Sequence, residues 1–127
     1  MNTPCSNHDS DYIFMDDINC NKTDQESFDD LIEAVKIWAD SRKLLQRSNI
    51  NAQMLKVMEE IGETAAAIAR GQRNEMIDGI GDSFVTLIIL AYQNGIDPTD
   101  ALRRAWNEIK DRKGKTENGV FVKMVDL

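Results

Sequence analysis

The chain has 127 residues, of which 29% are charged, and its formal net charge at pH 7 is −7. This length suits one domain with a real core. The excess of acidic residues argues against nucleic-acid polymers as partners, because no surplus of cations can replace their counterions. No apolar run approaches the roughly 18 residues of a membrane span, which argues against a membrane protein. Two cysteines, Cys5 and Cys20, lack metal-ligand spacing, so a reduced, cytoplasmic protein is expected.

Residues 1–26 are rich in Asn, Asp and Ser and show no sustained hydrophobic period. We therefore expect a flexible N-terminal arm over residues 1–26 and a folded domain over residues 27–127. Within the arm, the apolar segment YIFM at residues 12–15 is a candidate for docking on the domain or on a partner.

Helical spacing of apolar residues predicts four helices between Ser27 and Gly114. The first is expected to end near Gln46, the second at residues 70–72 (RGQ) and the third at residues 94–95 (NG). The fold class is therefore all-α and similar to a four-helix bundle, with an extended tail at residues 119–124. The positions expected to face the core are Phe28, Leu31, Ile32, Val35, Trp38, Met54, Val57, Met58, Ile61, Ala65, Ile68, Ile77, Ile80, Phe84, Leu87, Ile88 and Ala91. The fourth helix carries Ala101, Leu102, Ala105, Trp106 and Ile109 in the same way.

Three polar residues are placed to cap the later helices: Asn51, Asn74 and Asp97. Ile50 and Leu55 flank the first of these caps at the spacing of a hydrophobic staple. Asp97 is followed by a proline, which favours the first helical turn.

Carboxylates recur on the second and third predicted helices. Glu60 and Glu63 share one helix face, and Glu59 lies one turn before Glu63. The third helix carries a second set within roughly a 60° arc: Glu75, Asp78 and Asp82. If the two helices are antiparallel neighbours, the two sets converge, and such a cluster repels itself unless cations occupy it. An oxygen-rich cage of this kind suits Mg²⁺ or Mn²⁺, whereas the simpler alternative is a solvated acidic surface.

Two glycines lie inside predicted helices, where glycine costs about 1 kcal/mol relative to alanine. Gly62 and Gly81 are therefore expected to have a packing reason. The alanines after Glu63 make the second helix slim, so that a neighbour can approach it closely: Ala65, Ala66, Ala67 and Ala69. A di-iron carboxylate bundle is excluded, because it needs a histidine on two helices and the only histidine is His8, in the arm.

The segments EEIGE (residues 59–63) and IDGIGD (residues 77–82) resemble the MazG-type branch of the all-α nucleoside triphosphate pyrophosphohydrolases, whose pattern is EExxE, a spacer and ExxD. The similarity extends over about residues 31–123, including NEIKDRKGK (107–115) and NGVFVK (118–123), and is strongest to small phage-type members. The resemblance implies cleavage of an NTP or dNTP to the monophosphate and pyrophosphate with Mg²⁺. It also implies a homodimer or homotetramer and, for a phage-encoded protein, the host cytoplasm.

The resemblance further implies roles for individual residues. Glu60, Glu63 and Asp82 would hold the metal, and Glu59 would orient or deprotonate the attacking water. The chain departs from the pattern at Gly79, where the family has glutamate.

Asp78 lies on the same arc as Asp82 and is expected to supply the missing metal ligand. A glutamate at position 79 is expected to add a carboxylate near Asp82 and to strengthen the helix.

Candidate substrate-binding residues are Asn107, Lys110, Arg112, Lys113, Lys56 and Trp38. The basic residues would grip phosphates, although an exposed basic helix end explains them equally well. Trp38 or Trp106 could stack on a base, but a tryptophan on an apolar helical stripe is more often part of the core. The alternative to an enzyme is a binding or regulatory module that keeps the fold and does not turn over.

Overall fold

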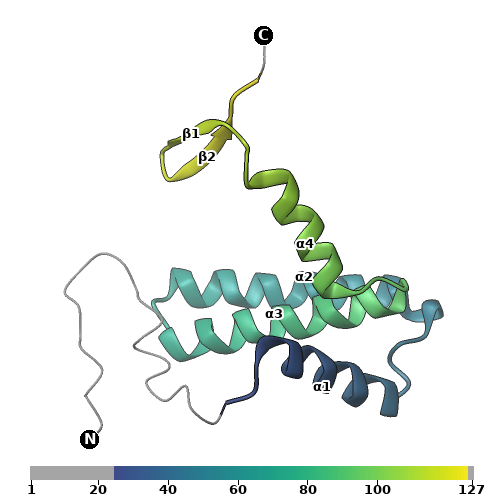
Figure 1. Cartoon of the computed structure of the whole chain (residues 1–127). Helices are drawn as coiled ribbons and strands as arrows, with labels where there is room; N and C mark the ends of the chain where they lie inside the picture. The colour runs from purple at the N-terminus through teal and green to yellow at the C-terminus, as the bar shows by residue number, and fades with distance from the viewer. Residues whose placement is uncertain (1–24, 126–127) are drawn as a thin grey trace, which may run out of the picture.

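The computed structural model describes residues 25–125, which form four α-helices and one β-hairpin (Figure 1). The helices are α1 (Phe28–Ser41), α2 (Ile50–Ala69), α3 (Arg73–Gln93) and α4 (Pro98–Ile109), with a short 3₁₀ turn, η2 (Arg47–Asn49), leading into α2. The hairpin consists of β1 (Gly114–Glu117) and β2 (Val120–Lys123). The all-α class is confirmed. Except for Gln25 and Glu26, the predicted arm, with both cysteines and residues 12–15, lies outside the described residues.

The helices α2 and α3 form an antiparallel pair joined by a three-residue turn, and α1 packs against α3 (Figure 1). The helix α4 contacts α3 near the turn that joins them and then leads away from the pair, carrying the hairpin at its far end (Figure 1). None of the described helices is both long and apolar enough to cross a membrane.

The first and last helices each begin at a residue whose side chain caps the helix. Ser27 and Asp30 form a reciprocal capping box at α1, with hydrogen bonds of 3.2 Å and 3.0 Å. At α4, the Asp97 carboxylate accepts hydrogen bonds from the backbone N–H of Thr99 and Asp100, at 2.8 Å and 3.2 Å. The predicted Asp97 cap is therefore confirmed, with proline at the first helical position.

The predicted caps at Asn51 and Asn74 are wrong. The helix α2 begins one residue before Asn51, because the η2 turn already sets a helical backbone, and α3 begins one residue before Asn74. Neither helix has a side-chain cap hydrogen bond. The expected staple is also absent, since the Leu55 residue is 72% exposed.

Three helices end at a residue with a left-handed backbone: Lys43 after α1, Gly71 after α2 and Gly95 after α3. The stops predicted at residues 70–72 and 94–95 are confirmed. The end predicted near Gln46 is wrong, because the backbone reverses at Lys43, where Leu44 N–H already bonds the Ala39 carbonyl at 3.0 Å.

The last helix is also shorter than predicted, and the extended tail is half of a hairpin. Asn118 and Gly119 have φ of 51° and 77°, the conformation of a type I′ turn, which matches the twist of two antiparallel strands.

Most of the side chains expected in the core are exposed. Among the described residues, six apolar side chains are buried: Ile32, Ala39, Val57, Ala67, Ile88 and Ile89. The α2–α3 contact instead buries small and polar residues, including Glu60, Gly79 and Thr86. The apolar stripes of α2 and α3 lie about 100° or more around each helix from this contact.

We call the exposed stripes together the apolar face. It comprises large side chains of all four helices, each 40–63% exposed: Phe28, Met54, Met58, Ile61, Ile68, Ile77, Ile80, Phe84, Leu87, Leu102, Trp106 and Ile109. The expectation that these residues pack inward is wrong for the single chain. The three-residue turn between α2 and α3 brings one side of each helix into contact. The apolar side of each helix lies outside this contact, and nothing in the described chain covers it.

Candidate functional site

Carboxylates of α2 and α3 surround a hollow of about 390 Å³ between the two helices. Glu63 comes from α2, and Glu75, Asp78 and Asp82 come from α3. Counting about 100° per residue, both helices turn these carboxylates to the side of the pair opposite the apolar face. Small residues between the helices leave the hollow open: Ala66, Ala67 and Gly79.

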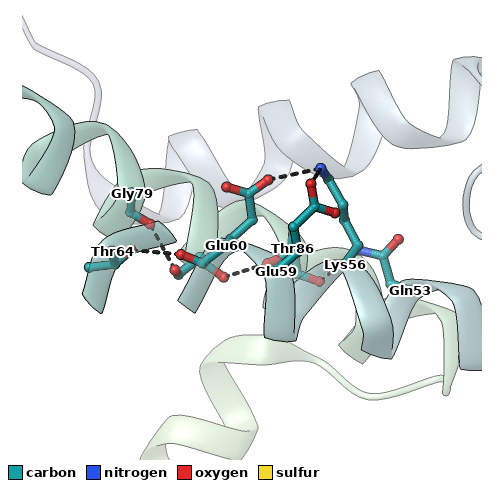
Figure 2. A network of polar contacts seen from close by, with 8 residues as sticks. Gln53, Lys56, Glu59, Glu60, Thr64, Gly79 and Thr86 are labelled. Carbon is teal, nitrogen blue, oxygen red and sulfur yellow. Dashed lines mark hydrogen bonds and ion pairs between the residues drawn. The ribbon is translucent and has the colours of Figure 1, made fainter. Parts of the chain in front are cut away.

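The other two carboxylates of the EEIGE segment are engaged by Lys56. The Lys56 ammonium lies 3.2 Å from the Glu59 carboxylate and 3.1 Å from that of Glu60 (Figure 2). The hydrogen bond to Glu60, followed by that to Glu59, raises the pKa of Lys56 above its usual value. Glu60 is only 7% exposed, and it does not line the hollow. Of the four predicted metal ligands, the structure brings together Glu63, Asp78 and Asp82 and places Glu60 beside Lys56.

The donors around the hollow fit Mg²⁺ in kind, because all of them are carboxylate oxygens. Within residues 25–125, however, no three His, Cys, Asp or Glu side chains lie close enough to hold an ion as they stand. Glu63, Asp78 and Asp82 would have to turn toward the centre of the hollow to share one ion.

At Gly79 the helix α3 lies in close contact with Thr64 of α2. A Cβ atom at this position would overlap Thr64 Oγ1 and would lie 3.2 Å from both Cα and Cβ of Thr64. The expectation that a glutamate at position 79 strengthens the helix is therefore wrong, since α2 leaves no room for any side chain there. The packing role predicted for Gly62 and Gly81 is wrong, because a Cβ atom at either position would meet no neighbouring atom within 4 Å.

One side-chain hydrogen bond in this region joins α2 to α3, and others lie within one helix or reach a neighbouring segment (Figure 2). Gln53 Nε2 donates to the Thr86 carbonyl at 3.0 Å across the helix pair, whereas Thr64 Oγ1 donates to the Glu60 carbonyl of its own helix at 2.8 Å. Gln93, only 2% exposed, donates to the Leu44 carbonyl at 2.7 Å and so ties the end of α3 to the segment after α1. These residues carry no motif, and our sequence analysis did not identify them.

Arg70 is the one cation among the described residues that line the carboxylate hollow. Sequence analysis missed it, although its spacing of seven residues from Glu63 places both side chains on the same face of α2.

The basic residues predicted to bind substrate lie elsewhere in the single chain. Asn107 and Lys110 are exposed near the end of α4, and Arg112 and Lys113 line a separate hollow of about 600 Å³ beside β2. The helix α4 leads away from the α2–α3 pair, so these side chains do not meet the carboxylates (Figure 1).

The two tryptophans are not part of the single-chain core, contrary to expectation. Trp38 is 45% exposed at the end of α1, and the Arg42 guanidinium lies 4.3 Å from the centre of its ring. Trp106 is 57% exposed, because α4 leads away from the α2–α3 pair (Figure 1).

Comparison with known proteins places these carboxylates in a recognised family region. The family model described as the MazG nucleotide pyrophosphohydrolase domain matches residues 48–116. An uncharacterised 18.2 kDa protein of the rep-hol intergenic region of Haemophilus phage HP1 is 42% identical over 67 residues. That match covers 53% of this chain and 41% of the phage protein, so the chain spans about two-fifths of the length of that relative. No solved structure matches the chain significantly.

Proposed function

Because the chain belongs to the family of MazG nucleotide pyrophosphohydrolase domains, we propose that it hydrolyses nucleoside or deoxynucleoside triphosphates to the monophosphate and pyrophosphate. The observation that carries this proposal is the hollow between α2 and α3, which combines carboxylates with one arginine inside the matched region. The phage relative supports the host cytoplasm as the place of action for a phage-encoded member.

The carboxylates of the hollow would hold Mg²⁺, with Mn²⁺ as a substitute. Glu63, Asp78 and Asp82 line the hollow already, and Glu60 would join them if its carboxylate turned away from Lys56. The chemistry that Mg²⁺ would supply at these carboxylates is positive charge to offset the negative charge that develops on the phosphate groups. Asp78 would supply the metal-ligand oxygen that other members of the family take from a glutamate at the position of Gly79.

The remaining steps belong to side chains of the chain itself. Glu59, one turn before Glu63, would orient the attacking water and accept its proton as the α–β phosphoanhydride is cleaved. Its carboxylate is half exposed and bound to Lys56, so water reaches it directly. Arg70 would donate hydrogen bonds to phosphate oxygens at the rim of the hollow, where a planar guanidinium suits a phosphate group.

Product analysis tests the reaction. The full chain is incubated with each common NTP and dNTP plus Mg²⁺, and the nucleotide products and pyrophosphate are resolved. Monophosphate and pyrophosphate are expected, whereas diphosphate and orthophosphate would contradict cleavage between the α and β phosphates.

Substitutions test the assignment of the ligands. Glu63→Gln and Asp82→Asn should each abolish most turnover, and Asp78→Asn should impair it about as severely as Asp82→Asn. Glu33→Gln, which removes an exposed carboxylate of α1 outside the hollow, is the matched control and should leave turnover unchanged. If Asp78→Asn behaves like this control, Asp78 is not a metal ligand.

A binding module without turnover is the second candidate function. Gly79 favours it, because the family glutamate is missing and the contact with Thr64 prevents any side chain from replacing it. Nucleotide binding measured by calorimetry, in a protein that releases no pyrophosphate from any triphosphate, would establish this alternative.

A further inference from the structure

A second hollow, of about 440 Å³, lies on the apolar face between α1, α3 and the start of α4. Its walls include Phe28, Leu87 and Leu102, one from each helix, and the rings of Phe28 and Phe84 meet edge to face at 5.7 Å. Asp29 is the one charged residue among the described residues that line it. Ligand pockets measure about 300–1,000 Å³, so this hollow has room for several apolar side chains.

The helix α4 begins at the edge of this apolar hollow. Residues 101–109 are all exposed in the single chain, and Leu102, in the wall of the hollow, is 63% exposed. An isolated helix of about 12 residues is marginal in water, so α4 needs contacts beyond its own turns. Thr99 Oγ1 donates to the Asp29 carboxylate at 3.4 Å, which links the start of α4 to the start of α1, but this contact is exposed. An apolar group in the hollow would therefore stabilise the start of α4.

The chain carries an apolar segment close to this hollow in sequence. The described residues begin at Gln25, three positions before Phe28, which lines the hollow. Between residues 2 and 24 the large apolar side chains are the four consecutive residues 12–15 (Tyr, Ile, Phe and Met) and Ile18. A short apolar run within a polar segment is typical of segments that bind an apolar groove.

The length of chain between this segment and α1 allows the two to meet. Met15 lies 13 positions before Phe28, so the stretch between them extends to roughly 45 Å at most. The helix α3, with 21 residues, is roughly 30 Å long, so the segment reaches every part of the hollow with slack. A tether of this kind gives an effective concentration on the order of millimolar. Weak affinity is therefore enough to keep the hollow occupied by a segment of the same chain.

We infer that residues 12–15, which lie outside the described residues, bind in the apolar hollow of their own chain. Their side chains cover Phe28, Leu87 and Leu102 and so stabilise the start of α4 against α1 and α3. Asp11 and Asp16, on either side of the segment, stay in solvent because burying an unpaired carboxylate is costly. The carboxylate hollow lies on the opposite side of the α2–α3 pair and stays open. The inference does not depend on whether the protein hydrolyses triphosphates.

Amide hydrogen exchange of the full chain tests the contribution to α4. Phe14→Ser removes the phenyl ring from the segment and should speed exchange at residues 101–105 by about tenfold, because local opening of α4 becomes easier. Ile18→Ser makes a comparable change outside the segment and is the matched control, so exchange should stay as in the unchanged protein. Both substitutions lie outside the described residues, so neither removes a side chain from the core.

A nitroxide attached to Cys5 tests where the segment binds. In the Cys20→Ser variant, Cys5 is the only cysteine of the full chain, and it lies seven positions before Tyr12. The nitroxide should broaden the amide resonances of residues 84–88 and 101–103 more than those of the β1–β2 hairpin, which lies at the far end of α4 (Figure 1). Adding Phe14→Ser should abolish this difference. A mixture of nitroxide-labelled chains and isotope-labelled chains should show no such broadening, because each segment binds its own chain.

Three results would overturn the inference. The first is equal exchange at residues 101–105 in Phe14→Ser and the unchanged protein. The second is a nitroxide effect that does not distinguish the hollow from the hairpin. The third is broadening that passes between chains in the mixture, or protection of α4 in Phe14→Ser that rises with protein concentration, since a second copy would then be the occupant.

Discussion

Gly79→Ala is the sharpest test of the helix contact beneath the carboxylate hollow. The new methyl group would overlap Thr64 Oγ1 and lie 3.2 Å from Thr64 Cα and Cβ. Rotating the Thr64 hydroxyl relieves only the first contact and breaks its hydrogen bond to the Glu60 carbonyl, at 2.8 Å. Because Cα and Cβ cannot rotate away, α2 and α3 must separate by a few tenths of an ångström.

The expected change in the free energy of unfolding combines two opposing terms. Overpacking a tight contact by one methyl group costs about 1–3 kcal/mol. Replacing glycine by alanine inside a helix gains about 1 kcal/mol. The net result is a destabilisation of about 1 kcal/mol, which lowers the melting temperature of a domain of this size by about 4–8 °C.

Gly62→Ala is the matched control, because Gly62 lies inside α2 with no neighbouring atom within 4 Å. This variant should gain about 1 kcal/mol, so the two substitutions should differ in sign. Urea unfolding with comparison of the midpoints and slopes measures both changes. If Gly79→Ala stabilises the protein as much as Gly62→Ala, the close contact with Thr64 does not exist.

A double-mutant cycle separates the contact from general effects of the substitution. Thr64→Ala removes the hydroxyl that the new methyl group overlaps, so Gly79→Ala should cost less in that background. A coupling of about 0.5 kcal/mol or more is expected for residues in direct contact. Additive free energies would contradict the argument.

Three further predictions concern the site and the helix caps. Arg70→Gln should weaken the binding of a non-hydrolysable triphosphate about tenfold in calorimetry, because a charge-assisted hydrogen bond is lost; unchanged affinity would remove Arg70 from the site. Asp97→Ala should lower the free energy of unfolding in urea by about 1 kcal/mol, and no change would show that the cap is dispensable. The backbone and side-chain hydrogen bonds with Ser27 lower the pKa of Asp30 from its usual 3.8. The stability from that carboxylate is therefore complete above pH 3.8 and is lost as the pH falls through the lowered pKa. Urea unfolding across that range should show that the free energy of unfolding depends less on pH in Asp30→Asn than in the unchanged protein. An identical pH dependence in the two proteins would contradict the contribution of the capping box between Ser27 and Asp30.

Much of this structure could be read from the sequence because it depends on neighbours within one helical turn. The four helices, the Asp97 cap and the stops at Gly71 and Gly95 follow from local spacing and from backbone preferences. The pairing of Lys56 with Glu59 and Glu60 was equally readable, since residues three and four apart meet on any helix.

The hairpin was also within reach of the sequence. The Asn118–Gly119 pair is the residue preference of its type I′ turn. Sequence analysis nevertheless identified only one of the two strands.

Only the tertiary structure decided which sides of the helices meet. Hydrophobic spacing marks one side of a helix as apolar, but it does not say whether the same chain or another one covers it. In this protein α2 and α3 meet along small and polar residues, with Gly79 against Thr64, and the apolar stripes remain exposed. The short turn between α2 and α3 restricts which sides of the two helices can face each other. At Gly79 the absence of a side chain lets the two backbones come closer than any other residue would allow. The same contact places Glu63, Asp78 and Asp82 around one hollow, an arrangement that depends on how the two helices pack as well as on spacing along each helix.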